Sequence, residues 1–493
     1  MNGQRKSLIV SIAALHVLSS VPLPFTWADF GAALLHPSAD LVFVIALAAL
    51  GRAGQKPRLA AAVGGALLLV SWIHQAALSL VPAFLERSFE FADIREIPSL
   101  YHLMLHDQPI WLHGLTLVGL PLVVVLTHRM VTRGLLHIGA FGNREQILHR
   151  FTLAAGLAVL LGVLNASLQA ERKLWVPSSL GALVREYGRE FAHWSHPEVL
   201  DAAVEQKLIA ADRRLNAEPA DLAGLGGADV HLMFVESYGR LTQRHPALAE
   251  RMRPVYAELE RELQAKGFHL QSTTCFPEVS GGGSWLTHAQ LYSGVPVPDR
   301  FTFDRVVAST LRPLPKRFQT AGYRTIEVLP AMHRHWNEGS IFYGFDEALT
   351  QQELDYRGTT YHWGKMPDQY ALHQLLTKHV LPAKQKLFTS FVSVTSHAPF
   401  RLIPPYVADW QIDAKTFAGP ARIEHPVTWL NMLQDPVALT AYGDAIEYSL
   451  RTMCGFACRL TRPSLVIVLG DHQPPIAATV QPPDNSKDVL MHV

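Results

Sequence analysis

Two carboxylates and an imidazole stand directly after apolar runs in the second half of this 493-residue chain. Glu236 follows the run 230–235, and Asp471 and His472 follow the run 465–469. Strand ends gather at one edge of a parallel sheet, so these side chains are expected to meet. A glutamate after a strand is by itself more often a cap or surface group, but the set of three suits one divalent cation. We predict one metal site, with Mn²⁺ preferred and Mg²⁺, Zn²⁺ or Ca²⁺ as alternatives.

A glycine-rich segment, Ser280-Gly-Gly-Gly-Ser284, lies between these two runs. Its glycines would let the backbone approach a bound anion, and a helix that begins at Ser284 would point free N–H groups at that anion. Beside a cation, the Ser284 hydroxyl would lose its proton more readily and become a nucleophile. The alternative is a flexible loop in which Ser284 caps the helix.

His397 follows a third apolar run, at 388–394. An imidazole that titrates near neutral pH can assist proton transfer. Helical spacing at 254–264 and 368–379 separates the apolar runs. Strands that alternate with helices predict an α/β domain with a mostly parallel sheet between layers of helices. Residues 228–493 are numerous enough for one such catalytic domain.

The first 170 residues contain long stretches with almost no charge. A bilayer is crossed by a helix of roughly 17–25 apolar residues. Windows of this kind occur at 7–27, 30–51, 59–85, 109–127 and 151–170. We predict a five-helix transmembrane anchor over 1–170, in preference to a signal peptide or to buried helices of a soluble protein.

Basic residues alternate between the loops of this anchor. The loop between the third and fourth windows holds only Arg87 and Arg95, beside several acidic residues. The N-terminus and the loops after the second and fourth windows carry Arg5, Lys6, Arg52, Lys56, Arg58, Arg129, Arg133, Arg144 and Arg150. Because Lys and Arg mark cytoplasmic loops, the N-terminus is expected in the cytoplasm of a cell (inner) membrane protein. The catalytic domain would then be periplasmic or extracellular.

Residues 171–227 mix basic and aromatic side chains, which is typical of a helical segment along the membrane interface or of an ordinary linker. Over the whole chain, 43 Lys and Arg balance 42 Asp and Glu, for a net charge of +1. A nucleic-acid-binding protein would carry a clustered basic excess, so that class is disfavoured. The 17% charged and 49% apolar fractions disfavour disorder over most of the chain.

Four segments together resemble the sulfatase-like branch of the alkaline phosphatase superfamily: Phe-Val-Glu236-Ser, Gly-Gly-Gly-Ser284 with Leu-Tyr-Ser-Gly294, Ser-His397-Ala-Pro-Phe, and Gly-Asp471-His472. The layout is similar to that of lipoteichoic acid synthases and periplasmic phosphoglycerol transferases, which place a catalytic domain outside a five-span anchor. The resemblance implies one set of metal ligands: Glu236, Ser284, Asp471 and His472. It also implies that Ser284 is the nucleophile and that His397 contacts the transferred group or the leaving oxygen.

The stretch His335-Trp336-Asn337 resembles the substrate-binding segment of lipoteichoic acid synthase. Leu286 and His288 replace the proline and arginine that direct conversion of a sulfatase nucleophile to formylglycine. An unmodified serine, and hence phosphoryl chemistry, is therefore expected.

The implied enzyme moves a phospho-head group of the phosphoglycerol or phosphoethanolamine type from a membrane phospholipid to a cell-envelope glycan or lipid, through a covalent Ser284 intermediate. A hydrolase of phosphodiesters or sulfuric esters and a non-catalytic sensor are the alternatives. Glu338 stands where lipoteichoic acid synthase has a substrate-binding arginine, so the head group stays open. Arg334 or Lys365 could supply the positive charge instead.

Cys275, Cys454 and Cys458 all fall in the part expected outside the cytoplasm, where disulfides persist. A bridge from Cys454 to Cys458 across one helical turn would be strained, and Cys275 could pair with either. The chain ends soon after Asp471, so the last strand and helices of the fold are expected to be short or absent, as in a truncated sequence.

Overall fold

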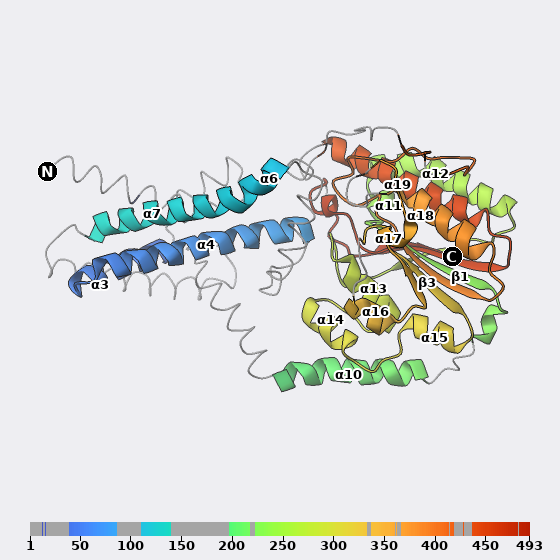
Figure 1. Ribbon diagram of the computed structural model, residues 1–493, viewed down its shortest axis with the longest axis horizontal. Helices are drawn as coiled ribbons and strands as arrows, with labels where there is room; N and C mark the ends of the chain where they lie inside the picture. The colour runs from blue at the N-terminus through green and yellow to red at the C-terminus, as the bar shows by residue number, and fades with distance from the viewer. Residues whose placement is uncertain are drawn as a thin grey trace. The chain divides into compact units, whose positions relative to one another are not determined.

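The computed structural model describes residues 39–85, 110–139, 197–216, 222–332, 337–359, 366–413, 415–418, 436–481 and 483–493, together with Ile12, Leu15, Tyr361 and Val427. The chain divides into two compact units. One comprises Met1–Pro82 and Ser88–Pro197, and the other comprises Ala83–Arg87 and Glu198–Val493. The described part of the first unit is helical, and the second contains a sheet with helices (Figure 1).

Apolar helices form the first unit: α3 (Ala39–Ala53), α4 (Pro57–Leu85), α6 (Ile110–Gly114), the π-helical turn η2 (Leu115–Gly119) and α7 (Leu120–Gly139). Their shared core consists of Leu15, Leu41, Val44, Ala48, Ala61, Leu68, Val131 and Leu135. Asp40, inside the predicted window 30–51, accepts a 2.6 Å hydrogen bond from the Ser71 hydroxyl. A polar partner reduces the cost of a carboxylate among apolar helices.

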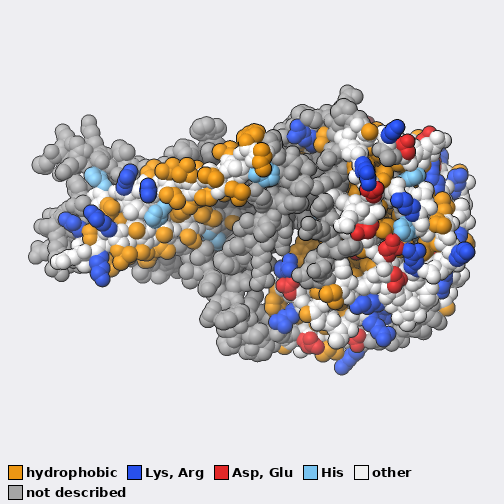
Figure 2. Space-filling view, in the orientation of Figure 1, with side chains coloured by type: hydrophobic (Ala, Val, Ile, Leu, Met, Phe, Trp, Pro, Cys, Tyr) orange, Lys and Arg blue, Asp and Glu red, His pale blue; other side chains and the backbone are white. Residues whose placement is uncertain are grey.

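Two stretches of the described helices are long and apolar enough to cross a bilayer, Pro57–His74 and Ile110–Ile138. They coincide with two of the predicted windows, 59–85 and 109–127. Apolar side chains gather along these helices (Figure 2). Large exposed ones on α6, η2 and α7 include Trp111, Leu117, Val118, Leu122 and Val125. Window 151–170, and all of 7–27 except Ile12 and Leu15, lie outside the described residues. The five-span count and the orientation therefore stay predictions.

The second unit contains a seven-stranded sheet in the order β2-β7-β6-β1-β5-β3-β4. The strands are β1 (Asp229–Val235), β2 (Ser272–Cys275), β3 (Arg324–Val328), β4 (Glu347–Leu349), β5 (Leu387–Val392), β6 (Ser464–Gly470) and β7 (Val489–His492). β6, β1, β5, β3 and β4 run parallel, while β7 is antiparallel to both β6 and β2. The predicted mostly parallel α/β sheet is confirmed.

The three apolar runs of the sequence are the three adjacent central strands β6, β1 and β5. Every residue of β1 is buried, because helices cover both faces of the sheet there. The register pairs Val230 with Phe388 and Val235 with Gly470. The carboxyl ends of β6, β1 and β5 therefore lie side by side, which is where the candidate residues follow.

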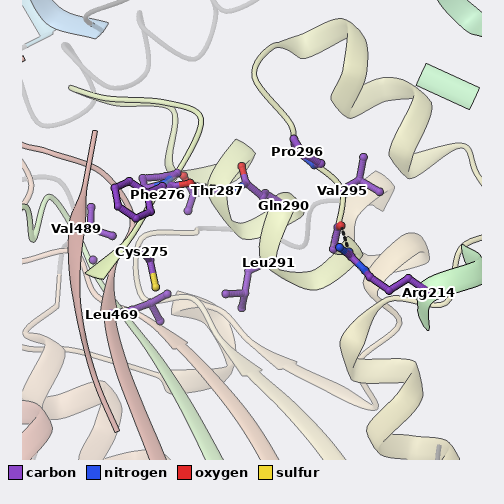
Figure 3. A pocket seen from close by; sticks show the side chains of 13 residues that line it. Arg214, Cys275, Phe276, Thr287, Gln290, Leu291, Val295, Pro296, Leu469 and Val489 are labelled. Atoms are coloured by element: carbon purple, nitrogen blue, oxygen red, sulfur yellow. Dashed lines mark hydrogen bonds between the residues drawn. The ribbon is translucent and has the colours of Figure 1, made fainter. Parts of the chain in front are cut away.

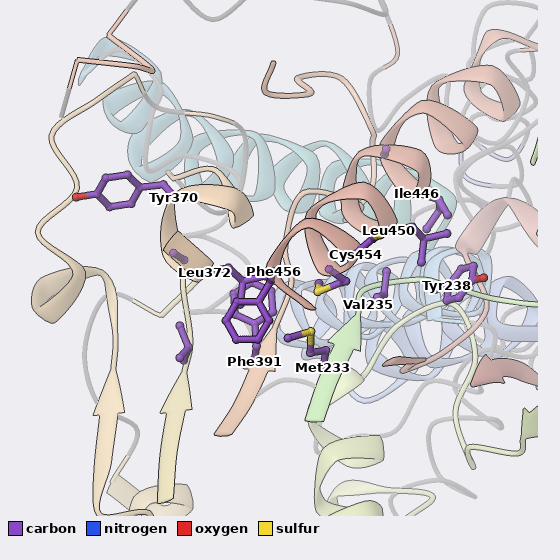
Figure 4. Close-up of a cluster of buried hydrophobic side chains, with 14 of the residues drawn as sticks. Met233, Val235, Tyr238, Tyr370, Leu372, Phe391, Ile446, Leu450, Cys454 and Phe456 are labelled. Atoms are coloured by element: carbon purple, nitrogen blue, oxygen red, sulfur yellow. The ribbon is translucent and has the colours of Figure 1, made fainter. Parts of the chain in front are cut away.

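Helices cover both faces of this sheet (Figure 1). One layer contains α12 (Pro246–Ala265), α18 (Asp368–Leu375) with its π-helical extension η4 (Leu376–Val380), and α19 (Pro436–Ala457). Its core is the larger apolar cluster, in which Met233, Phe391 and Phe456 meet (Figure 4). The predicted helix 254–264 starts earlier than expected, at Pro246, since Pro254 is tolerated inside α12.

The opposite layer contains α10 (Pro197–Asn216), α13 (Ser284–Ser293), α14 (Arg300–Val307), α15 (Leu314–Thr320) and α16 (Asn337–Tyr343). Short elements complete the unit: η3 (Ala223–Leu225), α11 (Leu241–Arg244), α17 (Gln351–Leu354) and η5 (Pro475–Ala478). α10 lies within the predicted linker 171–227 and buries Val204 and Leu208 in the core that α13 shares. Arg214 of α10 donates a 2.6 Å hydrogen bond to the Gly294 carbonyl at the end of α13.

Candidate active site

Glu236, Asp471 and His472 meet where β1 and β6 end. Their ligand atoms all lie within 4.8 Å of one another, and all three side chains are buried. Nε2 of His472 is 3.2 Å from Oε1 of Glu236 and 3.8 Å from Oδ1 of Asp471. The parallel pairing of β1 with β6 brings these residues together although 235 or more positions separate Glu236 from the other two.

Ser284 completes this cluster from a different part of the chain. Its Oγ lies 3.0 Å from Oε2 of Glu236 and 3.2 Å from Nε2 of His472. Ser284 is the first residue of α13, and the N-cap is Gly283, at φ 79° and without a side-chain capping bond. The interpretation of Ser284 as a helix cap is therefore wrong. Its hydroxyl faces the carboxylate and imidazole instead.

The two oxygens of Asp471 have different surroundings. Oδ1 accepts hydrogen bonds of 2.8 Å from the backbone N–H groups of Ser237 and His472. Oδ2 is buried and has no hydrogen-bond partner. A buried carboxylate oxygen without a donor is costly, so a cation at this position would supply the missing partner.

The imidazole of His472 is oriented by its own backbone. Nδ1 lies 2.8 Å from the Gln473 carbonyl, which can only accept, so Nδ1 carries the proton. Nε2 faces the two carboxylates, and it would present its lone pair to a cation bound among them. A second ring nitrogen anchored in this way is typical of metal-binding histidines.

Charges inside this buried cluster shift one another's pKa. Burial alone would raise the pKa of Glu236, but His397 and His472, with hydrogen bonds from His472 and Ser237, hold it well below its usual range. Burial and the negative charge of Glu236 raise the pKa of Asp471 to about 7. Burial lowers the pKa of His472, yet Asp471 and Glu236 together raise it to about 10. Excess negative charge of this kind favours a bound cation.

The backbone at the end of β1 is held in an unusual conformation. Ser237 has φ 59°, which costs free energy for a residue with a side chain. The buried Tyr442 hydroxyl donates a 2.8 Å hydrogen bond to the Ser237 carbonyl, and Ser396 Oγ donates one of 2.6 Å to the Glu236 carbonyl. Ser393 Oγ accepts a 2.9 Å bond from the Glu236 amide. These bonds fix the direction in which Glu236 points.

His397 follows β5, the neighbour of β1 on its other side. Nδ1 lies 2.7 Å from the Ala398 carbonyl, so Nδ1 carries the proton and Nε2 is the atom that can exchange one. Burial lowers the pKa of His397, and the charge of Glu236 opposes this shift. Asp368 holds the start of the same loop, because its carboxylate accepts 2.9 Å bonds from the amides of Val394 and Thr395.

Sequence reasoning missed the supporting residues Ser237, Asp368, Ser393, Ser396 and Tyr442. Only Ser237 carried a local signal, since it directly follows Glu236. The other contacts connect residues far apart in the chain, and no local pattern encodes them.

Other predicted residues fall outside the described part of the structure. His335, Trp336, Arg334 and Lys365 are among the residues that the structure does not describe. Asn337 begins α16, but its side chain is not described. Their substrate-binding roles stay predictions.

Thr287, one turn along α13 from Ser284, has a structural role. Its buried hydroxyl donates a 2.8 Å hydrogen bond to the Asp471 carbonyl. This bond occupies the hydroxyl and attaches α13, the helix that begins with Ser284, to the end of β6. His288, the next residue, packs on Phe234 with ring centroids 4.2 Å apart, and burial lowers its pKa to about 4.

A cavity of about 360 Å³ lies beside α13 (Figure 3). Apolar groups, among them Phe276, Leu291, Val295 and Leu469, form much of its lining, and Thr287 links it to the cluster through its bond to Asp471. Phe276 is 70% exposed at the rim. The cavity thus adjoins the helix that carries Ser284.

All three cysteines are free thiols. Cys275 Sγ lies 3.6 Å from Met491 Sδ, on β2 beside β7. Cys454 lies on α19, and its Sγ is 4.0 Å from that of Cys458. None of the disulfides considered from the sequence is present.

No protein-family model matches this chain. No curated protein matches it either. Similar solved structures include the lipoteichoic acid synthase LtaP from Listeria monocytogenes, at 15% identity and a TM-score of 0.35, covering 54% of this chain and 65% of that one. Another is a protein in the alkaline phosphatase superfamily from Vibrio parahaemolyticus, at 14% identity and a TM-score of 0.36, covering 54% of this chain and 60% of that one.

A third is the integral membrane lipooligosaccharide phosphoethanolamine transferase EptA from Neisseria meningitidis, at 14% identity and a TM-score of 0.49, covering 98% of this chain and 88% of that one. This chain spans less than two thirds of the length of the Listeria and Vibrio proteins.

Proposed function

We propose that this chain is a membrane-anchored, metal-dependent phosphotransferase of the sulfatase-like branch of the alkaline phosphatase superfamily, with Ser284 as its nucleophile. One observation carries the proposal: Ser284 Oγ lies 3.0 Å from Glu236 and 3.2 Å from His472, inside a buried cluster of metal-ligand type. A serine that merely capped a helix would have no reason to face this cluster.

A divalent cation fits these residues. Glu236, Asp471 and His472 would hold it with Ser284, and Oδ2 of Asp471 is a buried oxygen that lacks a donor. Mn²⁺ is the first candidate, with Mg²⁺, Zn²⁺ or Ca²⁺ as alternatives. When bound, such a cation supplies positive charge that favours the serine alkoxide and offsets negative charge on a phosphoryl group.

The protein's own residues then divide the reaction into two steps. The Ser284 hydroxyl passes its proton to solvent, its Oγ attacks the phosphorus of a phospholipid, a serine–phosphorus bond forms, and the phosphorus–oxygen bond to diacylglycerol breaks. His397 takes up a proton from solvent at Nε2 and gives it to the leaving oxygen, which leaves as the hydroxyl of diacylglycerol. An acceptor hydroxyl then attacks the same phosphorus and passes its proton to Nε2 of His397, the serine–phosphorus bond breaks, and Ser284 regains its proton from solvent.

The first turn of α13 supports the charge that develops in both steps. The helix begins at Ser284, and the first N–H groups of a helix lack partners four residues earlier and favour bound phosphate. Gly283, at φ 79°, brings the preceding backbone into this turn without the strain that a side chain would add. Fixed donors that need no rearrangement contribute most to charge stabilisation.

The helical unit is proposed to anchor the enzyme in the bilayer that contains its donor phospholipid. Two described stretches are apolar and long enough to span a bilayer, which supports an integral membrane protein. We propose a multi-pass anchor in the cell (inner) membrane, with the N-terminus cytoplasmic and the catalytic domain on the periplasmic or outer side. The donor phospholipid then shares a bilayer with the site, which raises its effective concentration. The acceptor is a glycan or lipid of the cell envelope.

A lipid-release assay tests this function. The full-length protein in detergent is incubated with Mn²⁺ and head-group-labelled phosphatidylglycerol or phosphatidylethanolamine, and diacylglycerol is measured. Ser284→Ala is expected to abolish release and the labelled serine adduct. Ser464→Ala is the matched control, because Ser464 is the first residue of β6 and so lies at the end of that strand away from Asp471. Equal release by the wild-type protein and Ser284→Ala contradicts the proposal. Transfer of label only to water would mark a hydrolase.

A further inference from the structure

A second cluster of metal-ligating side chains lies between α12 and α19, apart from the site of Ser284. Cys454 Sγ is 4.0 Å from Cys458 Sγ and 3.6 Å from Oε2 of Glu262. The ligand atoms of all three residues lie within 4.8 Å of one another. The mechanism uses none of these residues.

The helices themselves hold the two sulfurs on one side of α19. Cys458 comes directly after α19, and its amide donates a 2.9 Å hydrogen bond to the Cys454 carbonyl, which extends the helical turn. Cys454 is 5% exposed and belongs to the larger core cluster (Figure 4). Glu262 is exposed and Cys458 is half-buried, so one side of the cluster faces water.

The measured separations match those of a tetrahedral site. With zinc–sulfur bonds of about 2.3 Å and zinc–oxygen bonds of about 2.1 Å, tetrahedral geometry requires a sulfur–sulfur separation of about 3.8 Å and a sulfur–oxygen separation of about 3.6 Å. The structure has 4.0 Å and 3.6 Å. Cys454 thus already has the spacing that a tetrahedral site requires to both other ligands, the Cys458 and Glu262 ligand atoms lie within 4.8 Å of each other, and water can occupy the fourth position on the open side.

The contacts along the two helices also leave a place for a cation here. Arg251 of α12 pairs with Glu447 of α19 at 3.2 Å, and Arg451 of α19 pairs with Glu258 of α12 at 2.8 Å. Four residues after Glu258 on α12, Oε2 of Glu262 lies 3.6 Å from the Cys454 thiol of α19. Among the described residues, no Lys or Arg forms an ion pair with Glu262.

We propose that Glu262, Cys454 and Cys458 bind one zinc ion that joins α12 to the end of α19, a site separate from the catalytic cluster. Two thiolates and a carboxylate select a borderline-soft divalent ion such as Zn²⁺ over Mg²⁺ or Ca²⁺. Binding replaces the two thiol protons, which pass to solvent as two sulfur–zinc bonds form. The hydrogen bond from Cys454, with the smaller effects of the Lys266 and Arg459 charges, lowers the pKa of Cys458 against burial and Glu262. The same hydrogen bond and burial raise the pKa of Cys454, so the cation has to displace that proton.

Cobalt provides a probe that sees sulfur ligands alone. The full-length protein in detergent is reduced, freed of metal with a chelator and titrated with Co²⁺, which gives an intense near-ultraviolet charge-transfer band only when thiolate binds it. The wild-type protein is expected to show this band, and added Zn²⁺ is expected to abolish it. Ser284→Ala should keep the band, since the catalytic cluster contains no sulfur.

Matched cysteine variants locate the ion. Cys458→Ser should lose the band, and Cys275→Ser, the control on β2, should keep it. Glu262→Gln, an exposed change that leaves both thiols in place, should weaken Co²⁺ binding about tenfold. A second Cys458 variant, Cys458→Ala, with a melting curve for each protein, separates loss of a ligand from unfolding.

Several results would overturn the inference. These are the absence of the band in folded wild-type protein, a band that survives Cys458→Ser, and unchanged Co²⁺ affinity in Glu262→Gln. A Cys454–Cys458 disulfide in the purified protein, identified by mass spectrometry of its peptides, would also overturn it. None of these outcomes depends on the phosphotransferase activity, so failure of this inference is distinguishable from failure of the proposed function.

Discussion

The hydroxyl of Ser284 lies 3.2 Å from Nε2 of His472, across 188 positions of the chain. The two side chains come from the start of a helix and the end of a strand. Thr287 holds these elements together, since its hydroxyl donates to the Asp471 carbonyl. The separation between nucleophile and imidazole therefore depends on the packing of α13 against the end of β6.

Ser237 should control metal affinity without being a ligand itself. Its hydroxyl donates a 2.9 Å hydrogen bond to Oε1 of Glu236, and partners of this kind typically change metal affinity by about 10–100-fold. Ser237→Ala should weaken Mn²⁺ binding within that range, as measured by calorimetric titration, while Ser464→Ala should not.

Replacing Ser237 removes its hydroxyl and can also change the backbone strain at this position, and two variants separate these effects. At φ 59° glycine is less strained than alanine, so Ser237→Gly should melt higher than Ser237→Ala although both lack the hydroxyl. Equal melting temperatures for the two variants would argue against strain at this position.

Metal binding should weaken in mild acid. The pKa of Asp471 is raised to about 7, so its carboxylate gains a proton as the pH falls through that value, and the proton competes with the cation. The pKa of His472, raised to about 10, means that the cation also displaces a proton from this imidazole, so the apparent dissociation constant for Mn²⁺ should rise up to about tenfold per pH unit from pH 9 to pH 7 and more steeply below pH 7. Titrations from pH 5 to pH 9 check this, and a constant affinity across that range would contradict it.

Glu327 should make the protein less stable at high pH. Burial raises the pKa of this carboxyl on β3 to about 8, so the folded state holds a proton that the unfolded state loses near pH 4.5. The stabilising contribution is complete below the unfolded pKa and is lost as the pH rises to about 8. Glu327→Gln keeps the shape and removes the titration. Its melting temperature, relative to the wild-type protein, should rise between pH 5 and pH 9.

Phe388 should be among the costly core positions. Its ring stacks on Phe318 with centroids 4.0 Å apart and an interplanar angle of 7°, and it is 1% exposed. Phe388→Ala should lower the free energy of unfolding by about 3–5 kcal/mol. Val437→Ala, at a 36% exposed position on α19, is the control and should change it by less than about 1 kcal/mol. Denaturant titration of both variants gives the comparison.

The sequence predicted the centre of the sheet better than its edges. The buried strands β1, β5 and β6 are continuous apolar runs, which a strand buried on both faces requires. β2, with the sequence Ser-Thr-Thr-Cys, is partly exposed, so it needs no apolar run. β3, β4 and β7 are likewise too short or too mixed in character to stand out.

The candidate site followed the same division. Glu236, Asp471 and His472 were predictable because each directly follows a recognisable strand. Tyr442 was not, since its bond to the Ser237 carbonyl links a residue inside α19 to the end of β1 across 205 positions. Such a contact arises from tertiary packing and leaves no mark on the neighbouring sequence.

The position of β6 in the chain also sets the time at which the site can first exist. β6 is the last parallel strand to be synthesised, and the two residues that follow it are half of the cluster around Ser284. A nascent chain that has emerged only as far as α19 can contain the serine and Glu236 but has no cation pocket. The complete cluster of Glu236, Ser284, Asp471 and His472 therefore cannot form until synthesis has passed residue 472.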